Sequence, residues 1–217
     1  MGKAVTRFKP GDEVFGGTLF KLGCHAEYIR LAEDGMIAPK PANMPLEEAA
    51  AVFFGGFTVL GFLGKAPIQK GQKVLVYCAS GSVGVFAVQL AEHFGAEVTA
   101  VCSTANLALV KSLGADAVVD YTKEDFSRAG RVYDMVFDTV GKSGFWRSMK
   151  CLKRGGFYVL VSFIGGDWFI VGVLASILGG LWGSVTGRAK VVGSPKQGGI
   201  QNLLLLKELI EARKVRT

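Results

Sequence analysis

The middle of the chain alternates short apolar runs with segments whose apolar residues recur every three to four positions. The apolar runs have the length of strands and cover 74–77, 98–102, 117–120, 134–138 and 157–162. Helical periodicity occupies 82–94, 106–113 and 143–153. Continuous apolar strands separated by amphipathic helices are typical of a parallel sheet covered on both faces. The pattern therefore predicts an α/β fold with a doubly wound parallel sheet.

The flanking segments follow other patterns. Residues 1–42 contain short extended runs between glycines and prolines, in "EVF", "HAEYIRL" and "GMIAPKP". A helix is expected from Asn43, its N-cap, with a break near Gly55-Gly56. A last helix is predicted over 198–213, and "AKVVGS" (189–194) before it is typical of a strand at the edge of a sheet.

A turn of small residues, Ala79-Ser80-Gly81-Ser82-Val83-Gly84, joins the first strand of this pattern to its helix. This is the position of the dinucleotide fingerprint G-x-G-x-x-G, with Ala79 in place of the first glycine. Gly81 would let the backbone approach a pyrophosphate, and Gly84 would let the helix pack closely on the strand. The helix N-terminus would present N–H groups and a positive dipole end to the phosphates. The alternative is a tight turn with no ligand.

The end of the second strand indicates which nucleotide would be bound. NAD-binding domains place an acidic residue about 20 positions after the fingerprint, where it holds the ribose 2′-hydroxyl. Here the corresponding run is Cys102-Ser103-Thr104-Ala105-Asn106, which has no carboxylate. Hydroxyl and amide groups would not repel a 2′-phosphate, so the sequence favours NADP(H) over NAD(H).

Several further motifs occur along the chain in the same order as in one known protein family. The chain carries "RFKPGDEVFG", "HAEYIRL", "PLEEAAAVFFGGFTVLGFL", the 35-residue run 70–104 around the turn, "LVKSLGADAVVDY" and "YDMVFDTVGK". Together they resemble the medium-chain dehydrogenase/reductase superfamily, and within it the zinc-free quinone oxidoreductase, or zeta-crystallin-like, branch. The resemblance implies an NADP(H)-dependent oxidoreductase acting on quinones, enones or related carbonyls. It also implies a GroES-like barrel segment over 1–45 and a Rossmann NADP-binding domain over 46–217.

The resemblance assigns cofactor contacts to particular positions. The turn from Ala79 to Gly84 would hold the pyrophosphate, and Thr58 would face the cofactor cleft. The remaining implied contacts are Ser103, Thr104, Asn106 and Tyr121 around the adenosine phosphate, Val140 and Gly141 on the ribose side, and Ser162 and Phe163 near the nicotinamide. The catalytic proton donor is not identified by any motif.

The chain departs from the family pattern in three ways. Cys78 stands where the family usually has glycine, and Ala105-Asn106 replace the basic residue that often pairs with the 2′-phosphate. Family members also have further barrel strands at both ends, so the chain is expected to hold only part of the barrel. An alternative function follows, namely a catalytically incomplete NADP(H)-binding module that acts as a sensor or interaction protein.

Composition narrows the remaining possibilities. The 217 residues are 50% hydrophobic with a net charge of +7, and the basic surplus is spread along the chain. It suits an anionic small ligand and does not single out nucleic acid. The four cysteines have no C-x-x-C spacing, and adjacent Cys24-His25 lacks further ligands, so no metal is expected. A reducing compartment fits, and no signal peptide is recognised, so a cytoplasmic protein is the expectation. The resemblance implies a homodimer, formed by pairing of edge strands such as 189–194.

One apolar run raises the question of a membrane. The stretch from Trp168 to Trp182 has 15 residues without a charge, whereas a spanning helix needs about 20. A helix packed in a core or a subunit interface is the preferred interpretation, and membrane association is the alternative. Of the other single residues, Tyr28 alternates with apolar neighbours and is expected in the core, and His93 is expected in solvent at a helix end.

Overall fold

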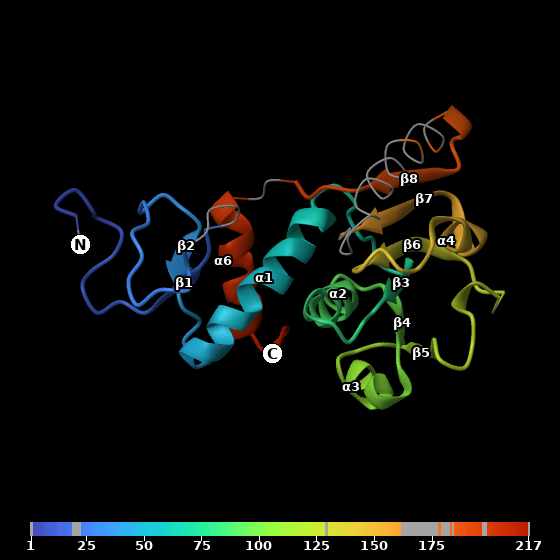
Figure 1. Ribbon diagram of the computed structural model, residues 1–217, viewed down its shortest axis with the longest axis horizontal. Helices are drawn as coiled ribbons and strands as arrows, with labels where there is room; N and C mark the ends of the chain where they lie inside the picture. Colours follow the sequence, from blue (N-terminus) through green and yellow to red (C-terminus); the bar gives the residue numbers. More distant parts are fainter. Residues whose placement is uncertain are drawn as a thin grey trace.

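The computed structural model describes residues 2–18, 23–128, 130–161, 178, 183, 185–196 and 199–216. A six-stranded, all-parallel sheet is its centre, in the spatial order β5-β4-β3-β6-β7-β8 (Figure 1). The strands are β3 (Lys73–Tyr77), β4 (Glu97–Cys102), β5 (Ala117–Asp120), β6 (Tyr133–Asp138), β7 (Leu152–Leu160) and β8 (Ala189–Val192). Numbered from β3, this is the order 3-2-1-4-5-6 of dinucleotide-binding domains.

Helices cover both faces of the sheet, as the apolar strands require. The first face packs against α2 (Ser82–His93) and α3 (Leu107–Ser112), which follows the short helix η1 (Thr104–Asn106). The second face packs against α4 (Phe145–Cys151) and the short helix η2 (Phe126–Arg128). Alternate residues of each strand enter the two cores, so the doubly wound α/β fold is confirmed.

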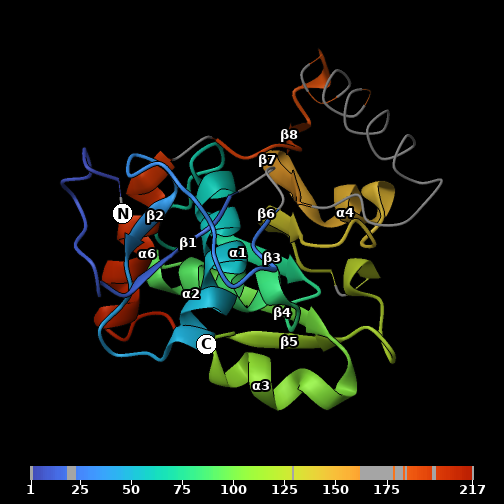
Figure 2. The same cartoon turned by 60° about the vertical axis from the view of Figure 1, so that its left-hand side comes forward.

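Two more helices extend the first core toward the N-terminal segment. α1 (Leu46–Leu63) and α6 (Gly199–Glu211) lie side by side between α2 and the small sheet of β1 (Val14–Gly16) and β2 (Ile37–Pro39) (Figures 1 and 2). β1 and β2 are antiparallel, and Phe15 and Ala38 are buried in the same core as α1 and α6. These two strands are the sheet structure among the described residues of 1–45, the segment in which the resemblance implied part of a barrel.

The expected break in the first long helix is wrong. α1 continues without interruption through Gly55 and Gly56, because these residues serve close packing. A Cβ on Gly55 would lie 2.4 Å from the Ser82 carbonyl oxygen, and one on Gly56 would lie 2.6 Å from a Leu206 methyl carbon. The glycine pair therefore lets α1 approach α2 on one side and α6 on the other.

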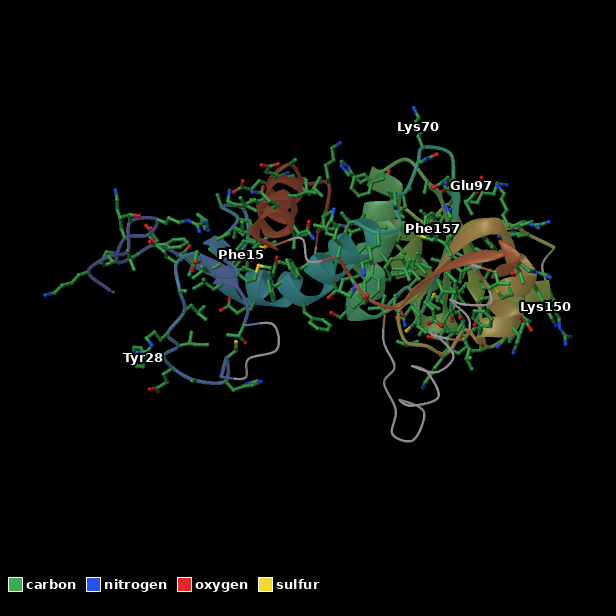
Figure 3. All side chains as sticks on the ribbon, turned by 90° about the horizontal axis from the view of Figure 1, so that it is seen from above. Phe15, Tyr28, Lys70, Glu97, Lys150 and Phe157 are labelled. Carbon is green, nitrogen blue, oxygen red and sulfur yellow. The ribbon has the colours of Figure 1, made fainter. Side chains whose placement is uncertain are left out.

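Two further local expectations are also wrong. Pro45, not Asn43, is the N-cap of α1, and the Asn43 amide instead donates a 2.9 Å hydrogen bond to the Ile210 carbonyl near the end of α6. Tyr28 is 89% exposed and lies at the outer rim of the N-terminal segment (Figure 3). The described residues of "HAEYIRL" form no strand, so the alternation around Tyr28 has no core to face.

The other strands and helices lie where the pattern predicted them, except around residue 152. β7 begins at Leu152, five residues before the predicted strand at 157, and it includes the end of the helix predicted over 143–153. β8 lies at the outer edge of the sheet, as "AKVVGS" predicted, and His93 is exposed in the last turn of α2. Most of the apolar run from Trp168 to Trp182 lies outside the described residues. Among the described residues one helix, α1, is long and apolar enough to span a membrane, but half of that window is buried inside the protein. Soluble core helices share these properties.

Candidate functional site

The candidate site lies where the carboxyl ends of β3 and β6 meet. These neighbouring strands are followed by connections that run to opposite faces of the sheet, which makes this the topological switch point where open α/β sheets bind ligands. The Thr139 side chain, just after β6, donates a 3.0 Å hydrogen bond to the carbonyl of Tyr77 at the end of β3. This hydrogen bond therefore joins the loops after β3 and β6 at the points where they leave their strands.

The turn after β3 has the conformation that a fingerprint requires. Cys78 has a φ of +60°, in the left-handed region that favours glycine, which explains why glycine is the usual residue there. Gly84 packs directly on the strand end, since a Cβ there would lie 2.2 Å from the Cys78 carbonyl oxygen. The chain needs glycine at 84 to bring α2 against β3.

Gly81 differs, because nothing in the protein requires a glycine there. Its φ is −79°, and a Cβ would meet only ordinary contacts, at 3.5 Å from the Cys78 carbonyl oxygen and 3.6 Å from its Sγ. A side chain could therefore stand at this position without disturbing the turn, so packing does not explain the glycine. Close approach of a phosphate to the backbone would require a glycine here.

The start of α2 presents unsatisfied backbone donors at this turn. Gly81 is the N-cap of this 12-residue helix, and no side chain caps it. The first N–H groups of a helix have no intrahelical acceptor, and the helix dipole adds a positive field there. The turn and helix can therefore bind an anionic diphosphate.

α1 passes close to the same helix start. Gly55 lies against the Ser82 carbonyl, and Thr58 follows one turn later on α1. Thr58 is half-buried. Thr58 thus lies on the helix that packs against α2, and its assignment to the cofactor cleft stays a prediction.

The end of β4 is tied to the same turn by polar side chains. The Asn106 amide donates to the Ser80 hydroxyl at 3.1 Å and to the Ser103 hydroxyl at 3.3 Å. Ser103 and Asn106 are half-buried, whereas Thr104 and Ala105 are exposed in η1. The structure thus brings the predicted pyrophosphate and adenosine-phosphate residues together in one hydrogen-bonded group.

A carboxylate that sequence reasoning missed also lies here. Asp120 ends β5 in register with Cys102, the last residue of β4, so it reaches the same sheet edge. Its Oδ2 accepts a hydrogen bond from the Thr104 hydroxyl, and its Oδ1 accepts from the Thr122 hydroxyl at 2.6 Å and the Thr122 N–H at 3.0 Å. These hydrogen bonds lower the pKa of Asp120 to about 2. The search for an acid near position 103 could not find it, because register brings it from the next strand.

The loop after β6 is organised by a second buried carboxylate. Asp138 is fully buried and accepts hydrogen bonds from the N–H groups of Val140 at 3.1 Å, Gly141 at 2.8 Å and Ser143 at 2.9 Å. Gly141 has a φ of +74°. The Asp138 carboxylate therefore fixes the Val140-Gly141 turn beside the switch point, where the resemblance placed the ribose side.

One predicted contact, Tyr121, is not part of this group, and two others lie outside the described residues. Tyr121 is 53% exposed, with its N–H bonded to the Cys102 carbonyl, so its ring stands at the rim of the site. Ser162 and Phe163 lie outside the described residues. Among the described residues no group of three or more His, Cys, Asp or Glu could hold a metal ion.

The sheet order, the glycine at 81 and the uncapped helix define a Rossmann-type dinucleotide-binding domain. A family model described as "Zinc-binding dehydrogenase" matches residues 82–180. The chain is 39% identical to a 2-methylene-furan-3-one reductase of Solanum lycopersicum, over 75% of this chain and 43% of that protein. It is 37% identical to an "NADPH-dependent alkenal/one oxidoreductase, chloroplastic" of Arabidopsis thaliana, over 72% of this chain and 42% of that protein.

The solved structure of the quinone oxidoreductase from Coxiella burnetii superposes with a TM-score of 0.83 at 31% identity, covering 100% of this chain and 65% of that one. The chain is therefore similar to enzymes of the medium-chain dehydrogenase/reductase superfamily, the family that the sequence motifs resemble. It spans less than half the length of the two curated plant relatives.

Proposed function

We propose that this protein binds NADP(H) at the turn from Ala79 to Gly84 and serves the reduction of a quinone, enone or related carbonyl compound. The observation that carries the proposal is Gly81 at the uncapped N-terminus of α2, a glycine that the packing of the protein does not require. A bound diphosphate would require a glycine at this position. The names of the relatives, which include an alkenal/one oxidoreductase and a quinone oxidoreductase, support the substrate class.

The residues present fit the cofactor in three places. The α2 N-terminus would hold the pyrophosphate, Ser103 and Asn106 would lie along the adenosine half, and Val140-Gly141 would face the other ribose. A bound NADPH would supply the hydride for the reduction. The protein's part is to hold the dinucleotide in one orientation and to exclude water from the reacting groups.

The experiment measures binding and turnover separately. Calorimetry with NADPH should show one site per chain, and NADPH oxidation at 340 nm should accelerate when a quinone or an α,β-unsaturated ketone is added. Absence of NADPH and NADH binding would refute the proposal. Elemental analysis after dialysis tests the expected independence from zinc, and one tightly held zinc per chain would contradict it.

A second candidate is a binding module without turnover. It is favoured by the N-terminal segment, whose described residues form only a two-stranded sheet and leave Tyr28 exposed. Tight NADPH binding with no oxidation across a panel of quinones and enones would support this alternative. Turnover above the rate of a matched Gly81→Val variant would exclude it.

A further inference from the structure

The ion pair at the end of β5 stands at the adenosine side of the candidate site. Lys123 Nζ lies 3.7 Å from Asp120 Oδ2, and the lysine side chain is 67% exposed while that of Asp120 is 8% exposed. The same Oδ2 accepts the Thr104 hydroxyl. Thr104 belongs to η1, whose Asn106 reaches Ser80 in the fingerprint turn. Side-chain contacts, together with the backbone of η1, therefore connect the fingerprint turn to Lys123.

This arrangement changes the electrostatics expected at the end of β4. The sequence there has no acid, but Asp120 brings a permanent negative charge beside Thr104. The Asp120 carboxylate already accepts hydrogen bonds from the Thr104 hydroxyl and from the hydroxyl and N–H groups of Thr122. It could accept a hydrogen bond from a ribose 2′-hydroxyl only by losing one of these three. Its charge would still repel a 2′-phosphate at this position, unless a cation lies between them.

The Lys123 ammonium is the cation that could lie between the Asp120 carboxylate and a 2′-phosphate. Its bond to Asp120 is long and solvent-exposed, so the pair contributes little by itself and the ammonium is free to move. A lysine ammonium on a flexible stem binds phosphate as a point charge. Ser103, Thr104 and Asn106 can add only neutral donors.

We propose that Lys123 is the residue that selects NADPH over NADH, by binding the 2′-phosphate while it neutralises Asp120. This inference rests on the proposed function, and it assigns the phosphate-binding charge to the loop after β5. The basic residue that is lacking at Ala105-Asn106 is thereby replaced from the neighbouring strand end.

Calorimetry with NADPH and NADH tests the inference on the full chain. Lys123→Gln should weaken NADPH about tenfold and leave NADH unchanged, since each ~1.4 kcal/mol is a factor of ten and a screened charge-assisted hydrogen bond contributes about that. Lys123→Arg should restore the preference for NADPH. Lys70→Gln is the matched control, because it removes the same charge from another exposed loop. Lys70 precedes the amino end of β3 (Figure 3), whereas Lys123 follows the carboxyl end of the parallel strand β5.

The results distinguish a failure of the inference about Lys123 from a failure of the proposed function. If the unaltered protein binds NADPH and NADH but Lys123→Gln changes both equally, or neither, the inference is refuted and the proposed function stands. An equal loss in the Lys70→Gln control would also refute it, because net charge alone would then explain the effect. If the unaltered protein binds neither nucleotide, the proposed function is refuted and this inference with it.

Discussion

Replacing each of the two glycines of the fingerprint turn by alanine should change a different property. Gly84→Ala should lower the stability of the protein, whereas Gly81→Ala should weaken nucleotide binding. In Gly84→Ala the new Cβ would lie 2.2 Å from the Cys78 carbonyl oxygen and 2.7 Å from the Ala79 carbonyl carbon. Both neighbours are main chain, so α2 must move away from β3. Overpacking costs about 1–3 kcal/mol, and the rigid neighbours place this case at the upper end. For a domain of this size the melting temperature should fall by about 6–12 °C.

Gly81→Ala should instead fold normally and lose the nucleotide. Its Cβ meets nothing closer than 3.5 Å, and a φ of −79° suits alanine. The poorer N-cap and the smaller entropy loss on folding both amount to about 0.5–1 kcal/mol with opposite signs. The methyl group, however, would stand at the N-cap of α2, where the proposed diphosphate approaches the backbone. Losing one charge-assisted hydrogen bond of about 1.5–3 kcal/mol should weaken NADPH about 10- to 100-fold.

Thermal melting and calorimetry on both variants check this prediction. Normal stability with lost binding is expected for Gly81→Ala, and a lowered melting temperature for Gly84→Ala. A Gly81→Ala protein that binds NADPH as tightly as the unaltered chain would refute the assignment of that position to a phosphate. An undisturbed melting temperature in Gly84→Ala would refute the packing argument for α2.

Three further predictions concern the surroundings of the site. Ala105→Arg, at an exposed position of η1, should tighten NADPH by roughly tenfold and barely affect NADH, and equal tightening of both would contradict the placement of the 2′-phosphate. Burial raises the pKa of Cys151 to about 11, so iodoacetamide at pH 8 should alkylate exposed Cys24 and half-buried Cys78 and spare Cys151 until the pH approaches 11, as read by peptide mass spectrometry. Bound NADPH should protect Cys78 alone, and protection of Cys24 would point to another site. The free edge of β8 should mediate self-association, so a monodisperse monomer in light scattering at high concentration would count against it.

The local pattern of apolar and polar residues was sufficient to predict the fold of the central domain. Apolar strands of four to six residues with helices between them have few stable arrangements, because both faces of each strand must be covered. The fingerprint turn could be recognised for the same reason, since its glycines sit at fixed spacing between a strand and a helix. The bounds of β5 agree with the prediction residue for residue, and those of β3 and β4 differ by one.

Contacts between distant segments could not be predicted in this way. Gly55 and Gly56 resemble a helix break in sequence, but the positions of Ser82 and Leu206 turn them into packing surfaces. Asp120 is 16 residues from Thr104, and only the register of β4 with β5 brings the two together.

What the sequence by itself determined is therefore the fold class, the position of the fingerprint turn and the similarity to one superfamily, because these depend on spacing along the chain. The tertiary structure alone decided that Gly84 is needed for packing while Gly81 is not. It also decided which charges surround the end of β4, since the Asp120 carboxylate and Lys123 arrive there from the neighbouring strand. Electrostatics at a parallel sheet edge depend on which strand ends are neighbours, and that is a property of topology rather than of local sequence.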